Sequence, residues 1–80
     1  MRYVYLLESE QDGRQRYVGM TTDLKQRLGE HNAGKSPHTS RHMPWRLVTY
    51  IAFSDVDKAQ EFERYLKSGS GHAFANKRLW

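Results

Sequence analysis

The chain is predicted to fold as one α+β domain over residues 1–80, with a three-stranded antiparallel sheet flanked by helices in the order β-β-α-β-α-α. Three observations predict this class. Segments rich in aromatic and β-branched residues alternate with segments whose apolar residues recur at helical spacing. No repeat or linker interrupts them. A length of 80 residues leaves room for one small domain.

The first half of the chain is predicted to form a β-hairpin followed by a helix. Residues 3–7 are apolar on both faces, which is typical of a buried strand. Residues 16–19 are the second predicted strand, after a polar loop with a turn signal. The side-chain oxygens of residues 21–23 can cap a helix that extends to about Ala33.

The second half is predicted to form a strand and two helices. Residues 35–44 contain two prolines and several hydroxyl residues, which indicates a loop. Residues 45–53 have the composition of the third strand. Ser54 and Asp55 can cap a helix over residues 56–67, and glycines then interrupt it. One or two further helical turns are expected over residues 72–79.

Composition restricts the classes of function. No apolar run approaches the roughly 18 residues of a membrane span. Cysteine is absent, so disulfide frameworks and thiolate metal sites are excluded. The N-terminus lacks the apolar core of a signal peptide, and we expect a cytoplasmic protein. The net charge of +4 favours a polyanionic partner.

Two predicted helices carry polar side chains within their apolar stripes. On a helical wheel, Arg27 and His31 fall in the stripe of the first helix and Glu63 falls in that of the second. A carboxylate that faces a core is costly unless it is paired, hydrogen-bonded or bound to a metal. Either Glu63 pairs with Arg27 and holds the two helices in register, or it serves chemistry. His31 alone is more often a hydrogen-bonded residue at the edge of a core than a catalyst.

The strands add two tyrosines to this set. Side-chain alternation places Tyr5 on one face of the first strand, and Tyr17 and Gly19 together on one face of the second. Tyrosines that face each other on neighbouring strands could carry their hydroxyls to the sheet edge, although tyrosine is also simply a good strand residue. A glycine near a strand end indicates that something approaches the backbone closely.

Taken in order, these residues resemble the GIY-YIG nuclease domain, above all its small single-domain bacterial members. Residues 3–5 and 17–19 correspond to the two tripeptides of the family name, and Arg27, His31 and Glu63 follow on matching helices. The resemblance covers essentially the whole chain. It departs at the first position, where tyrosine replaces glycine, and valine replaces isoleucine in both tripeptides.

The resemblance implies a metal-dependent endonuclease that hydrolyses phosphodiester bonds in nucleic acid, with DNA as the expected substrate. Glu63 would be the only protein ligand of one Mg²⁺ or Mn²⁺ ion. Tyr17 would activate the attacking water, and Arg27 would bind the phosphate and support loss of the Tyr17 proton. Tyr5 would orient the water or a phosphate oxygen. His31 would bond Tyr17 or the phosphate, or act as an alternative base.

We expect these side chains to surround one shallow, open patch, because residues from two helices and two strands converge only if both helices flank one sheet face. Other residues in loops or at element ends are candidates for contacting phosphates together with Arg27: Lys35, Arg41, Arg46, Lys67, Asn76 and Lys77. A solvated charged face is the alternative for this set. His38 and His42 lie in the proline-bounded loop without a third ligand, so a substrate-facing loop is favoured over a metal site.

Two other functions compete with the nuclease. The first is a catalytically weak or idle nucleic-acid-binding module of the same fold, and the second is a structural or partner-interaction domain in which Glu63 and Arg27 merely pair. The chain has no appended DNA-binding module, so we expect weak, salt-dependent binding or a protein partner that supplies specificity.

Overall fold

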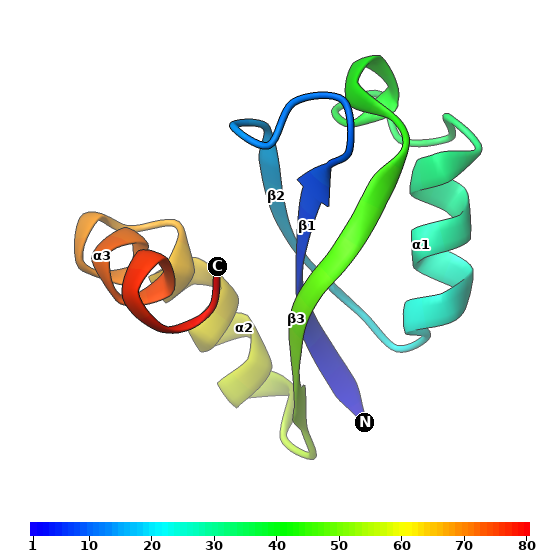
Figure 1. Cartoon of the computed structure of the whole chain (residues 1–80). Coiled ribbons are helices and arrows are strands. Elements are labelled where there is room, and N and C mark those ends of the chain that lie inside the picture. Colours follow the sequence, from blue (N-terminus) through cyan, green and yellow to red (C-terminus); the bar gives the residue numbers. More distant parts are fainter.

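A computed structural model describes all residues of the chain, 1–80. Three strands, three α-helices and one short 3₁₀ helix follow one another in the predicted order (Figure 1). Their bounds are β1 (Arg2–Ser9), β2 (Arg16–Thr21), α1 (Leu24–Asn32), the 3₁₀ helix (Ser40–His42), β3 (Trp45–Phe53), α2 (Val56–Leu66) and α3 (Gly69–Arg78).

The sheet is antiparallel throughout, with the strand order β2-β1-β3. The predicted fold class is therefore confirmed. β1 is the central strand, and its residues from Val4 to Leu7 are at most 2% exposed. The register pairs Tyr5 with Gly19 and Leu7 with Tyr17, so the two tyrosines share one face of the sheet. β2 is an edge strand, so one of its edges has no neighbouring strand, and side chains from both faces of the sheet can lie beside that edge.

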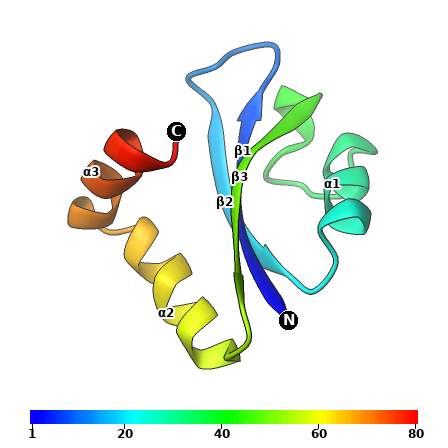
Figure 2. The ribbon, with the colours of Figure 1, turned by 60° about the horizontal axis from the view of Figure 1, so that its bottom comes forward.

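Helices cover both faces of the sheet (Figure 2). α1 packs on the face that presents Tyr5 and Leu7, and α2 and α3 pack on the face that presents Val4 and Leu6. The expectation that both helices flank one face is wrong, and so is the expectation that Glu63 shares one patch of that face with Tyr5, Tyr17 and Arg27. Because β1 is apolar on both sides, a single helical layer would leave one apolar surface of the sheet uncovered.

Side-chain caps begin α1 and α2 where the sequence predicts them. The Asp23 carboxylate accepts a hydrogen bond from the Gln26 amide, and Asp55 accepts from the amides of two residues in the first turn of α2. Gly34, with a φ of 76°, follows the C-terminus of α1. None of the helices is long and apolar enough to cross a membrane.

α3 is longer at its N-terminus than predicted, because the glycines do not interrupt the helix there. The Ser68 hydroxyl accepts from the Gly71 amide at 3.2 Å and so caps a helix that begins at Gly69. Gly71 is the point of closest approach to α2, since a Cβ at this position would overlap the carbonyl group of Tyr65. The glycine that suggested a break therefore allows the two helices to pack together.

Candidate active site

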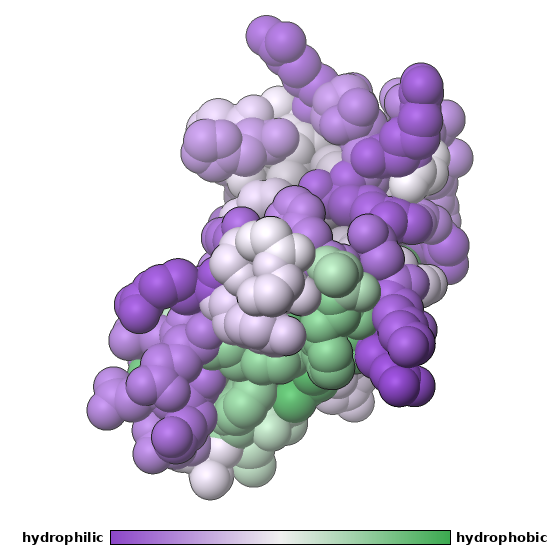
Figure 3. All heavy atoms as spheres, turned by 90° about the vertical axis from the view of Figure 1, so that its left-hand side faces the viewer, coloured by the Kyte–Doolittle hydropathy of each residue, from purple (hydrophilic) through white to green (hydrophobic).

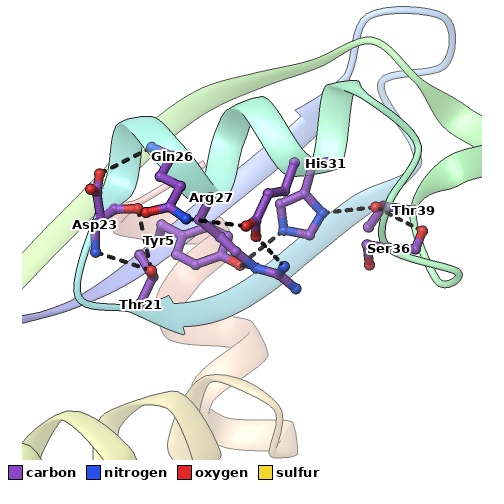
Figure 4. A network of polar contacts seen from close by, with 9 residues as sticks. Tyr5, Thr21, Asp23, Gln26, Arg27, His31, Ser36 and Thr39 are labelled. Carbon is purple, nitrogen blue, oxygen red and sulfur yellow. Dashed lines mark hydrogen bonds and ion pairs between the residues drawn. The ribbon is translucent and has the colours of Figure 1, made fainter.

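A chain of hydrogen bonds runs from the sheet through α1 into the loop that follows it (Figure 4). The Tyr5 hydroxyl lies 2.9 Å from Nε2 of His31, and Nδ1 of His31 lies 2.7 Å from Oγ1 of Thr39. Both His31 and Thr39 are fully buried. Every buried side-chain nitrogen and oxygen in the structure has a hydrogen-bond partner. His31 is thus a satisfied core residue that also touches a predicted catalytic tyrosine.

The Ser36 carbonyl fixes which groups donate and which accept along this series of hydrogen bonds. The Ser36 carbonyl can only accept, so the Thr39 hydroxyl donates to it, at 3.5 Å, and accepts from Nδ1–H of His31. Nε2 is then the acceptor for the Tyr5 hydroxyl. Burial, assisted by the charge of Arg27, lowers the pKa of His31, which keeps the ring neutral. Burial likewise raises the pKa of Tyr5, which keeps its phenol protonated.

Arg27 joins the same network at the protein surface. Its Nε donates to the Tyr5 hydroxyl at 3.4 Å, and its Nη1 donates to Glu30 at 2.8 Å. The hydrogen bond from Arg27 lowers the pKa of the Glu30 carboxyl. The ion pair that the sequence allowed between Arg27 and Glu63 is not formed, because α1 and α2 lie on opposite faces of the sheet. Nη2 of Arg27 remains without a partner in the protein.

Tyr17 and Gly19 complete the α1 side of the site. The Tyr17 ring is half-buried, and its centroid lies 5.0 Å from that of His31 and 6.3 Å from that of Tyr5. A Cβ at Gly19 would overlap the ring and hydroxyl of Tyr5 and come within 2.9 Å of the Tyr17 ring. The close approach predicted at Gly19 is therefore made by Tyr5. The Tyr5 phenol occupies the space that a side chain at residue 19 would fill.

Glu63 lies on the other side of β2, where its carboxylate is 3.2 Å from Nζ of Lys67. Its side chain is 25% exposed and lines a surface hollow with Met20 and Lys67. Lys67 also lines a neighbouring pocket together with Tyr17. Burial is the main cause of the raised pKa of Tyr5, and the charge of Glu63 adds to it. The Glu63 carboxylate and the Tyr5 phenol therefore interact electrostatically across the edge strand.

Comparisons with known proteins identify this arrangement. The family model described as the GIY-YIG catalytic domain matches residues 1–77. The chain belongs to the GIY-YIG family. A UPF0213 protein of Streptococcus pyogenes serotype M5 is 39% identical over 66 residues, covering 81% of this chain and 70% of that one. A UPF0213 protein of Streptococcus pneumoniae serotype 4 is 38% identical, covering 81% and 65%.

A solved structure supports the same assignment. The solution NMR structure of the UPF0213 protein BH0048 from Bacillus halodurans is 32% identical and matches with a TM-score of 0.57, over 99% of this chain and 87% of that one. The GIY-YIG family is a nuclease superfamily whose members are generally endonucleases that act on nucleic acid. The resemblance inferred from the tripeptides and from Arg27, His31 and Glu63 is confirmed.

A metal ion in this GIY-YIG domain would have few protein ligands. The structure contains no group of three or more His, Asp or Glu side chains that could hold a metal ion. Glu63 is the only carboxylate in its hollow, which Gln60, Arg64 and Lys67 also line. Mg²⁺ is often bound through one or two carboxylates, waters and substrate phosphates, and this donor set fits such a site. A cation there would compete with Lys67 for the Glu63 carboxylate.

The other predicted GIY-YIG contact residues are spread around this site. Lys35, Arg41 and Lys77 are exposed. Arg46 forms an ion pair with Glu8, and the Asn76 side chain accepts from Arg16 at 3.2 Å. His38 is exposed and His42 packs edge-on against Trp45, so the structure does not bring these two histidines into a metal cluster.

Sequence reasoning missed two residues that contact the candidate site. Glu30 holds Arg27, and its position three residues further along the helix would have been the signal for it. Thr39 fixes the tautomer of His31 from a loop, where no periodicity marks it.

Proposed function

We propose that the protein is a metal-dependent endonuclease that hydrolyses phosphodiester bonds in DNA. One observation carries the proposal. Tyr5, Tyr17, Arg27 and His31 gather on one face of the edge strand β2, and Glu63 reaches the same edge from the other face. Membership of a nuclease superfamily supports this reading. An active site that straddles an edge strand is open along its length, which suits a polymer backbone.

Glu63 would be the protein ligand of one Mg²⁺ or Mn²⁺ ion. When bound, such an ion neutralises charge at the phosphate and stabilises the leaving oxygen. Lys67 shields the Glu63 carboxylate in the protein without metal, and it becomes available for a phosphate oxygen once the carboxylate has another partner. This exchange gives Lys67 a role in substrate binding that follows from metal binding.

Arg27 is held in a position suited to a phosphate. Tyr5 and Glu30 engage two of its three nitrogens and fix the plane of the guanidinium. The remaining Nη2 can donate to a phosphate oxygen, and a bond to a charged acceptor is stronger than one to a neutral acceptor. Glu30 is therefore a positioning residue for Arg27.

Tyr17 is the proposed acceptor of the proton from the attacking water. Lys67 lines the same pocket as Tyr17, so a cation borders the position where the proton would be accepted. His31 cannot reach the water directly, because its Nε2 is occupied by Tyr5. It can serve as a base only through the Tyr5 hydroxyl, which would take a proton from water as it gives its own to Nε2.

A cleavage assay with a matched control tests the proposal. Duplex, branched and single-stranded DNA are incubated with Mg²⁺ or Mn²⁺ and with the wild type, Glu63→Gln or Glu61→Gln. Glu61 lies on the same helix, its side chain is 64% exposed, and its only charged partner is Lys58. We expect Glu63→Gln to abolish cleavage and Glu61→Gln to preserve it. Cleavage that persists in Glu63→Gln, or in the presence of a chelator, would overturn the proposal.

The competing function is a nucleic-acid-binding module without activity, and the pairing of Glu63 with Lys67 is the observation that favours it. In that case the wild type would bind DNA in a salt-dependent way and cleave none of the three substrates with either metal. A protein partner that supplies specificity would show itself as cleavage that appears only when the partner is added.

A further inference from the structure

A pocket of about 520 Å³ lies directly beside Tyr17, between β2 and the α2–α3 unit. Residues of the β1–β2 loop, the end of α2, α3 and the last residue, Trp80, line it. Figure 3 views the molecule from the α3 side, where hydrophilic side chains border the exposed hydrophobic ones. The proposed cleavage of the nucleic-acid backbone involves Tyr17 and Lys67 but assigns no role to the other residues that line this pocket.

The lining of the pocket combines positive charge with a flat aromatic surface. Arg14, Arg16 and Lys67 line it, each ion-paired with a carboxylate outside the lining, and no acidic residue lies in the lining itself. The Arg16 guanidinium lies over the Trp80 ring, 4.7 Å from its centroid. Cations attract a phosphate, and indole and guanidinium planes both stack on the face of a nucleobase. The ligand that matches this lining is a nucleotide.

We propose that this pocket holds the base of an unpaired nucleotide next to the bond that is cleaved. The inference rests on the proposed function for the position of that bond beside Tyr17. A base inside a duplex has its faces covered by its neighbours in the stack, so it cannot contact Trp80 without leaving the stack. The pocket therefore favours substrates that are single-stranded or frayed at the cleavage position.

The position of the pocket supports this assignment. Tyr17 and Lys67 belong to its lining, and Lys67 also borders the hollow that contains Glu63. A phosphate held between Arg27, Tyr17 and Glu63 would thus leave its neighbouring nucleotide at the mouth of this pocket. Asn76 keeps Arg16 in place by accepting from its Nη1, which makes Asn76 a positioning residue here.

Binding to short oligonucleotides tests the inference without cleavage. A thymidine oligonucleotide and a blunt duplex that contains it are titrated in the presence of a chelator, and the intrinsic tryptophan emission is followed. Trp45 is 4% exposed and gives a constant background, whereas Trp80 is half-buried at the pocket. We expect the single strand to quench the emission and to bind about tenfold more tightly than the duplex.

Two pairs of variants assign the site. Trp80→Ala should weaken single-strand binding about tenfold and remove the quench, while Tyr50→Ala, an exposed aromatic on the opposite edge strand, should change neither. Trp80 also packs on the core, so Trp80→Ala could unfold the protein. A second pair of variants, at exposed positions, tests the pocket without that risk. His72→Glu places a negative charge in the pocket, and Ala73→Glu places the same charge one residue further along α3, outside it.

The outcomes separate this inference from the nuclease proposal. Weaker binding of single strands by His72→Glu, but not by Ala73→Glu, is the expected result. Equal affinity for the single strand and the duplex, or equal effects of the two glutamates, would overturn the inference. Duplex cleavage that depends on Glu63 but is unaffected by His72→Glu would leave the nuclease standing without this subsite. Single-strand quenching with no cleavage of any substrate would leave the subsite and remove the nuclease.

Discussion

The two faces of the sheet are built from different chemistry. Beneath α1, the buried residues include His31, Thr39 and Ser36, which are joined by hydrogen bonds. Beneath α2 and α3, the buried cluster is purely apolar, and Glu63 stands at its rim with a partly exposed side chain. The candidate site residues on the first face are part of the core, whereas Glu63, the candidate carboxylate on the second face, is not.

Activity and stability should therefore be coupled on the α1 face and independent at Glu63. A buried polar network is stable only while each of its members is satisfied, so a change at one position exposes the others to a desolvation cost. A surface pair such as Glu63 and Lys67 contributes little to stability. Substitutions on the α1 face should therefore affect both folding and cleavage, and substitutions of Glu63 should affect cleavage alone.

The largest expected effect on stability is that of His31→Leu. The substitution leaves the Tyr5 and Thr39 hydroxyls without their partner in the core, at a cost of about 3 kcal/mol in the free energy of unfolding. Urea denaturation measures this cost. The same substitution at the exposed His38 is the control and should change stability by less than about 0.5 kcal/mol. A loss of under about 1 kcal/mol for His31→Leu would show that the network is not coupled to folding.

Gly19→Ala should come next, because the new Cβ would displace the Tyr5 ring. We expect a loss of about 1–3 kcal/mol, together with reduced cleavage. Gly29→Ala is a matched control in an exposed turn of α1, where nothing lies within 4 Å of the added Cβ, and it should stabilise the protein by about 0.5–1 kcal/mol. If the two alanines behaved alike in thermal unfolding, the close approach of Tyr5 would be disproved.

Thr39→Val keeps the shape of the side chain and removes the acceptor of Nδ1–H. We expect a loss of about 1–2 kcal/mol in stability. The ¹⁵N chemical shifts of the His31 ring should also show a mixture of tautomers in place of the Nδ1–H form. An unchanged tautomer in the variant would mean that Thr39 does not orient the ring.

The pH dependence of stability should report the buried state of His31. Its folded-state pKa lies below the ordinary value of 6.5, so the unfolded chain binds more protons as the pH falls below about 6.5. Stability from this group is complete above that pH and is lost on acidification through the folded-state pKa. We expect stability to fall between about pH 7.5 and about pH 5.5, and His31→Gln should remove this part of the slope. A wild-type slope that survives in His31→Gln would assign it to another group.

The smallest expected effect on stability is that of Glu63→Gln. Its partner Lys67 is 55% exposed, and exposed pairs four residues apart on a helix contribute about 0.3–0.5 kcal/mol. The midpoint of thermal unfolding should therefore stay close to that of Glu61→Gln. A loss of several kcal/mol would show that Glu63 has a structural role in the core.

Much of the fold could be predicted from local patterns. The three strands and the caps at Asp23 and Asp55 follow from residue chemistry within a few positions, and they agree with the structure apart from one or two residues at some ends. The apolar character of residues 3–7 on both faces already contained the information that both faces are covered. A sheet covered on both faces carries α1 and α2 on opposite sides, so the two helices cannot supply one patch on a single face.

The site itself was less accessible from sequence. The identities of Tyr5, Tyr17, Arg27, His31 and Glu63 followed from order and resemblance, but their partners depend on tertiary packing. Arg27 pairs with Glu30 because the two share a helix, and Glu63 is separated from both by the sheet. The buried acceptor Thr39 lies in an irregular loop that has no period to analyse.

The central claim is that Glu63 and Tyr17 act on the same substrate from opposite faces of β2. A Mn²⁺ titration followed by NMR tests it most directly, because the paramagnetic ion broadens the signals of nearby nuclei. We expect selective broadening of Glu63, Lys67 and Tyr17, little effect on the far end of α1, and loss of the broadening in Glu63→Gln but not in Glu61→Gln. Broadening that leaves Tyr17 untouched, or that persists in Glu63→Gln, would contradict the account.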